Sequence, residues 1–195
     1  MSEDESNPPF ASAVLFEYIA LTDVLDRDVV ASRSVLLVAD TQFNRRQFVR
    51  AVTADIETTV GSMIRVALDV GDGTDDPFTA SEYALLQERV REMLSVGAIH
   101  RAQSPVTTKT NIRFAFSVFT RAMRSTYSLP ADESAWGELV ETFAIRDRIA
   151  LPKASTELDV TDDELRAVHA ADVWFDKHSA EAMKFSRYAE MQRRA

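Results

Sequence analysis

The chain contains no cysteine, which excludes disulfide bonds and metal sites built from thiolates. It has only five glycines and six prolines among 195 residues, so few positions interrupt regular structure. No run of about 18 apolar residues occurs, and we therefore expect no membrane-spanning helix. Residues 1–9 are polar and acidic, without the basic start and apolar run of a signal peptide. We predict a flexible acidic N-terminus over 1–9 and a cytoplasmic protein that does not bind membranes.

Basic residues are outnumbered: 31 acidic and 22 basic residues give a net charge of −9 and a pI near 4.9. A protein that binds nucleic acid through its phosphates usually has the opposite balance, because neutralising phosphates supplies most of the affinity. The composition therefore disfavours broad, non-specific binding of nucleic acid. A local basic cleft on an acidic body stays compatible with it.

Apolar residues recur at helical spacing along most of the sequence, and 46% of all residues are apolar. The pattern predicts one all-helical domain over 10–195, a bundle of about five to seven helices. The segment 28–39 is rich in valine and leucine and would also suit a strand, but no second strand pattern exists to pair with it. We expect helices over 10–25, 28–39, 41–69, 81–96, 107–127 and 134–150, and a last helix that runs from Thr161 to near the C-terminus.

The loop at 71–77 carries three aspartates, which raises the question of a calcium site. Its spacing lacks the central glycine and the closing glutamate of a calcium-binding loop. We interpret it as a solvated connection between helices. The sequence shows no other set of metal ligands and no glycine-rich phosphate loop, so we expect no metal and no cofactor.

The segment 145–153 is the candidate functional site, because charged residues gather in the last turn of a helix there. Arg146 follows Leu139 and Phe143 at spacings of four and three, so it continues the apolar side of the helix. A guanidinium in such a position needs a carboxylate, a carbonyl or a bound anion. Glu57 and Asp55 on the long helix are the candidate carboxylates for a structural ion pair. The alternative is an anion or RNA site made by Arg146, Arg148 and Lys153.

The same segment, together with residues 43–51 and the pair Ile56-Glu57, resembles the HEPN superfamily of small all-helical bacterial domains. Many of these domains are metal-independent ribonucleases of toxin–antitoxin, abortive-infection and RNA-guided defence systems. Their motif is an arginine, a polar residue, a few further residues and a histidine, near the end of a late helix. The resemblance extends over about residues 40–175. It implies a homodimer, since the sites of the family are often assembled across a dimer interface.

Residues 146–153 read Arg-Asp-Arg-Ile-Ala-Leu-Pro-Lys, and they match this motif only in part. Arg146 and Asp147 stand at the positions of the arginine and its polar neighbour, which makes them the candidate catalytic residues. Leu151 stands where the family has its histidine. Leucine cannot transfer a proton, so the general acid–base contribution, typically about 10²–10⁴-fold, is missing at this position. The resemblance therefore implies a catalytically degenerate member of the family.

Only three histidines could replace the missing one: His100, His169 and His178. We expect His100 in a loop and the other two on the last helix. Each of these two has an aspartate within three residues, and a nearby carboxylate can tune an imidazole as a base. Ordinary pairing on a helix surface explains both positions more simply.

Three functions follow from these observations. The first is a HEPN-like protein without cleavage activity that binds RNA, a nucleotide or a protein partner in a defence or toxin–antitoxin setting. The second is an active metal-independent endoribonuclease that uses Arg146 with a base outside the motif. The third is a helical scaffold or interaction protein in which Arg146 is purely structural. The acidic pI and Leu151 favour the first and the third.

Overall fold

The computed structural model describes residues 13–71, 78–94, 105–131 and 133–194. These residues form six α-helices and one short 3-10 helix, without any strand among them. The prediction of an all-helical bundle is confirmed. The elements are α1 (Ala13–Val38), α2 (Gln42–Gly71), α3 (Ala80–Leu94), α4 (Pro105–Ala122), α5 (Glu133–Ala150), η1 (Ser155–Leu158) and α6 (Asp162–Arg194). The N-terminal segment 1–9, residues 72–77 of the aspartate-rich loop and His100 lie outside the described residues.

Two of the expected boundaries are wrong. Segments 10–25 and 28–39 belong to one continuous helix, α1, and not to two. Helix α4 ends at Ala122 and not at Tyr127, because Arg124 adopts a left-handed φ of 51°. The amide of Ser125 then donates to the carbonyl of Thr120 at 2.8 Å, which closes the helix.

Threonine caps start two of the helices. Thr79 and Glu82 form a capping box at α3, where the Thr79 amide donates to Glu82 Oε2 at 2.8 Å. Thr161 and Glu164 form the second at α6, with the corresponding bond also at 2.8 Å. The prediction that the last helix starts at Thr161 is confirmed, because this capping box places Thr161 directly before α6.

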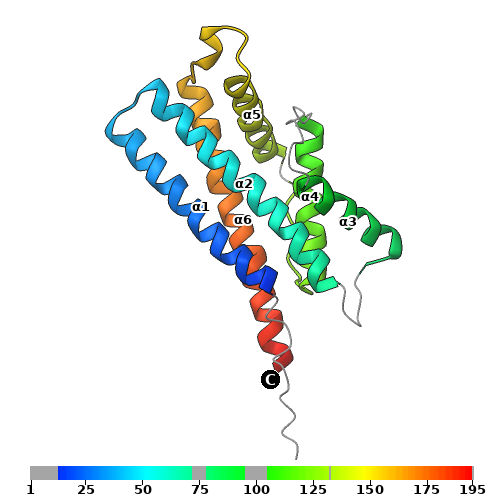
Figure 1. Cartoon of the computed structure of the whole chain (residues 1–195). Helices are drawn as coiled ribbons and strands as arrows, with labels where there is room; N and C mark the ends of the chain where they lie inside the picture. The colour runs from blue at the N-terminus through cyan, green and yellow to red at the C-terminus, as the bar shows by residue number, and fades with distance from the viewer. Residues whose placement is uncertain (1–12, 72–77, 95–104, 132, 195) are drawn as a thin grey trace, which may run out of the picture.

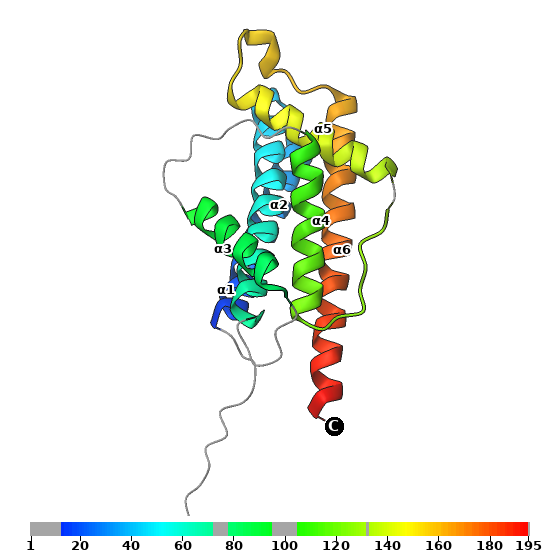
Figure 2. The same cartoon turned by 90° about the vertical axis from the view of Figure 1, so that its right-hand side faces the viewer.

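Helix α2 is the centre of the bundle and packs against all five other helices. Its buried side supplies much of the core, with Val49, Val52 and Met63 fully buried. Helices α2, α4 and α6 run side by side in Figure 2, and α5 packs across α6 near η1. No helix of the described residues is long and apolar enough to cross a membrane.

Helix α1 lies at one edge of the bundle, and α3 lies at the opposite edge (Figure 1). Helix α1 packs mainly along α2, and its residues Tyr18, Val29 and Leu36 are buried there. Tyr18 also reaches α4, where its ring meets Phe119 edge-on at 6.0 Å. The side of α1 that faces away from α2 is exposed to solvent.

Candidate functional site

The segment 145–153 ends α5 and leads into η1. The helix ends at Ala150, where the Leu151 amide still donates to the Asp147 carbonyl at 3.1 Å. Pro152 disfavours helical geometry at the residue before it, which explains the stop. The Leu151 side chain points away from the core and is 70% exposed.

Arg146 forms a two-pronged ion pair with Glu57 of α2. Its Nη1 and Nη2 donate to Glu57 Oε2 and Oε1 at 3.2 and 2.8 Å. Its Nε lies 2.8 Å from Asp147 Oδ1, an ion-pair contact that lacks hydrogen-bond geometry. The guanidinium also lies over the Phe143 ring, 5.4 Å from its centre, and the side chain is only 16% exposed. Both carboxylates compete with any anion that would bind this arginine.

Asp55, the other carboxylate considered for Arg146, is not its partner. Residues 55 and 57 point about 200° apart on an α-helix, since successive residues turn by about 100°. Glu57 therefore faces α5, whereas Asp55 is buried near α1 and α6.

Arg148 joins the end of α5 to the start of α6. Its Nη1 donates to the carbonyls of Glu157 and Asp159, the latter at 2.9 Å, and its Nη2 donates to Glu164 Oε1 at 2.7 Å. Glu164 is also the acidic member of the capping box at α6. Arg148 therefore holds the connection between the two helices in place.

The three cations considered for anion binding do not converge. Arg146 points to α2 and Arg148 points to η1 and α6. Lys153 is exposed, and its backbone amide donates to Glu157 Oε2 at 2.7 Å. The two arginines, which point to different elements, therefore form no common anion site.

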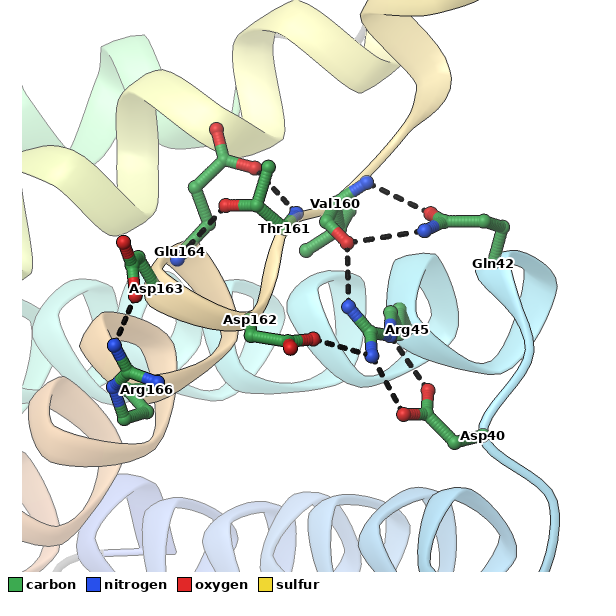
Figure 3. A network of polar contacts seen from close by, with 9 residues as sticks. All are labelled: Asp40, Gln42, Arg45, Val160, Thr161, Asp162, Asp163, Glu164 and Arg166. Atoms are coloured by element: carbon green, nitrogen blue, oxygen red, sulfur yellow. Dashed lines mark hydrogen bonds and ion pairs between the residues drawn. The ribbon is translucent and has the colours of Figure 1, made fainter.

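A second network fixes the connection between η1 and α6 from the side of α2 (Figure 3). Gln42 bonds both backbone groups of Val160: the Val160 amide donates to Gln42 Oε1 at 2.7 Å, and Gln42 Nε2 donates to the Val160 carbonyl at 3.1 Å. Arg45 donates to the same carbonyl at 2.8 Å and pairs with Asp40 and Asp162. Arg45 was not among the residues that the sequence indicated for the site. Its partners could not be read from the sequence, because one of them is a backbone carbonyl more than a hundred residues away.

A cluster of three carboxylates, which the sequence pattern did not reveal, lies where α1, α2 and α6 meet. Ligand oxygens of Asp26, Asp55 and Asp176 lie within 4.8 Å of one another. Burial, and then the charges of Asp26 and Asp176, raise the pKa of Asp55 to about 7. Burial, and then the charge of Asp172, raise the pKa of Asp176 to about 6. Carboxylate oxygens suit hard cations, so these three residues could hold a metal ion. A proton shared between two of the carboxylates accounts equally well for their proximity.

Neither described histidine stands in for the missing motif histidine. His169 is exposed on α6. His178 is buried, its Nδ1 lies 2.6 Å from the Tyr127 hydroxyl, and burial lowers its pKa. It lies roughly 20 Å along α6 from Glu164, the residue that contacts Arg148, because each helical residue adds about 1.5 Å. His178 thus belongs to a separate aromatic cluster with Tyr127 and Trp174.

Comparisons with protein families, with curated proteins and with solved structures found no match to this chain. The HEPN resemblance therefore stays a prediction from residues 43–57 and 145–153.

Proposed function

We propose that this chain is a non-catalytic interaction protein, which presents the outward side of α1 to a protein partner. The observation that carries the proposal is the exposure of large apolar side chains along that helix. Val30 is 58% exposed, Leu37 83% and Val38 89%. Large apolar side chains on a helix normally face a packing partner, yet these lie on the side of α1 that faces away from α2, its main contact.

Eleven of the exposed residues of α1 form one continuous stripe, which we name the α1 outer face, and the exposed acidic residues Glu17, Asp26 and Asp28 lie along its borders. It comprises Phe16, Ala20, Asp23, Val24, Arg27, Val30, Ala31, Ser34, Val35, Leu37 and Val38. Contiguous apolar surface of this kind marks binding sites on soluble proteins, whereas single exposed apolar residues do not. Two of the eleven side chains, Asp23 and Arg27, are charged, and the further charges lie at the borders of the stripe, as at an interface with an apolar centre and a polar rim.

The arrangement at the end of α5 supports the non-catalytic part of the proposal. Arg146 is held by Glu57 and Asp147, and Arg148 is held by Glu164 and two carbonyls. Leu151 offers no group for proton transfer. Binding of RNA or a nucleotide, a defence or toxin–antitoxin role, and residual ribonuclease activity stay predictions from the HEPN resemblance, and the contacts of these two arginines favour none of them.

Site-specific photo-crosslinking in the cells that make the protein tests the proposal. A photoreactive residue at Val30 should give a defined adduct, because that position lies in the middle of the α1 outer face. The same residue at Val173 of α6, which is 51% exposed, is the matched control on another surface. Equal labelling at both positions, or no adduct at Val30, would contradict the proposal.

A further inference from the structure

The α1 outer face has the spacing of a coiled-coil seam. Its central line consists of residues separated alternately by four and three positions: Phe16, Ala20, Asp23, Arg27, Val30, Ser34 and Leu37. This spacing averages 3.5 residues, the repeat with which two helices keep one seam in contact over a long distance. From Phe16 to Leu37 the seam is roughly 30 Å long. Val24, Ala31 and Val38 flank it along one side and widen the apolar surface.

The seam is complementary to itself when two copies run antiparallel. If the two-fold axis passes beside position 25, residue i of one copy lies opposite residue 50 − i of the other. Phe16 then meets Ser34 and Ala20 meets Val30, so that a large side chain faces a small one in both layers. Asp23 meets Arg27, and symmetry repeats each of these contacts.

The two charged residues are available for such a contact. Arg27 Nε donates to the backbone carbonyl of Asp23 at 2.9 Å. Among the described residues, no charge from another helix is paired with either side chain.

Other pairings of the same seam leave these charges opposed or unmatched. A parallel pairing puts Asp23 against Asp23 and Arg27 against Arg27, which repel. An antiparallel shift by seven residues in one direction puts Arg27 opposite Val30, and in the other direction it puts Arg27 opposite Phe16. Each shift would place an unpaired charge in an apolar layer, which costs free energy. Because of this cost, the pairing of Asp23 with Arg27 favours one register of the two helices.

We infer that the partner of the α1 outer face is a second copy of this chain, paired antiparallel with Asp23 opposite Arg27 of the partner subunit. This inference rests on the proposed function and names its partner. Because α1 lies at the edge of the bundle, a second copy can approach it without displacing another helix (Figure 1). In the segment 145–153, the side-chain contacts of Arg146 and Arg148 are with α2, η1 and α6, and none of them is with α1.

Charge reversal tests the pairing and its register together. Asp23→Arg and Arg27→Asp should each weaken self-association at least about a hundredfold, because each places two pairs of like charges face to face. An equimolar mixture of the two variants should form a heterodimer, since every opposed pair then carries opposite charges. The double variant should dimerise as the original chain does. Sedimentation velocity over a range of concentrations measures all four samples.

Apolar positions supply the control for this experiment. Val30→Asp places a charge in the seam and should abolish the dimer, whereas Val173→Asp, on α6, should leave it unchanged. Thermal melting of each variant establishes that it is folded. A monomeric original chain, or a dimer that neither single reversal weakens, would overturn the inference.

Photo-crosslinking at Val30 separates this inference from the proposed function. An adduct with a second copy supports both. An adduct with a different protein, together with a monomeric chain in sedimentation, keeps the proposed function and overturns the inference. Absence of any adduct overturns both.

Discussion

The guanidinium of Arg146 meets the carboxylate of Glu57 with both of its terminal nitrogens, at 3.2 and 2.8 Å. This contact joins the last turn of α5 to the middle of α2, the helix around which the bundle is built. It gives a structural reason for a charged residue on the inward side of α5. It also occupies the one arginine that the HEPN resemblance would use in catalysis.

Replacing Arg146 should therefore lower the free energy of unfolding. We expect Arg146→Ala to cost about 1–3 kcal/mol, since a partly buried, charge-assisted pair is lost and Glu57 is left without it. Arg146→Lys should recover only part of the loss, because lysine cannot make the two-pronged contact. Urea unfolding measures both. Arg166→Ala, at an exposed arginine paired with Asp163, is the control and should stay within about 0.5 kcal/mol of the original chain. An equally small effect at Arg146 would refute its structural role.

Restoring the motif histidine tests the non-catalytic reading. We expect Leu151→His to cleave no RNA, because Arg146 stays bound to Glu57 whichever residue stands at 151. In the assay, the variant protein is incubated in excess over a structured RNA without metal ions. The RNA products are then analysed for 2′,3′-cyclic phosphate ends. The Leu151→His, Arg146→Ala double variant is the control for contaminating nuclease. Cleavage that appears in the single variant and disappears in the double variant would support a degenerate HEPN site and contradict our proposal.

The carboxylate cluster predicts how stability depends on pH. In the folded chain the pKa values of Asp55 and Asp176 are raised to about 7 and about 6. The folded state therefore binds more protons than the unfolded state between about pH 4 and pH 7. Stability should fall as the pH rises through this window and level off above about pH 7. Each linked proton changes the unfolding equilibrium by up to about tenfold per pH unit.

Asp55→Asn should flatten this profile and raise the melting temperature at pH 8, because it removes the most deeply buried charge of the cluster. Melting curves at fixed protein concentration from pH 4 to 9 measure the effect, since self-association makes the melting temperature depend on concentration. Asp163→Asn, at an exposed aspartate, should keep the slope of the original chain. A wild-type profile that is flat or rises over this range would show that the cluster holds no proton in the folded state.

The sequence predicted those features of this molecule that depend on local pattern. Amphipathic periodicity predicted α2 to α6, and the predicted start of the last helix at Thr161 agrees with α6. The pattern predicts two helices where the structure has α1 alone, because the segment 28–39 is rich in valine and leucine and does not continue the pattern of 10–25. A helix that packs on one side and stays apolar on the other does not show the usual two-sided pattern.

At the candidate site two carboxylates, Glu57 and Asp55, were predicted as partners of Arg146, and the structure pairs it with Glu57. The direction of each side chain on α2 decides between them, and that direction follows only once the facing helices are known. The cluster of Asp26, Asp55 and Asp176 could not be predicted, because its members come from three helices that meet only in the folded chain. The bonds between Gln42 and Val160 depend on backbone groups, which carry no sequence signal.

Disulfide trapping across α1 tests the central claim most directly, and the absence of natural cysteines keeps its background clean. Ala20→Cys and Val30→Cys chains, one of them tagged, are mixed and oxidised mildly. Our account predicts a disulfide between positions 20 and 30 of two different chains in the mixture, and little covalent dimer in either variant alone. A mixture that stays uncrosslinked, or a variant that links readily to itself, would contradict antiparallel pairing through the α1 outer face.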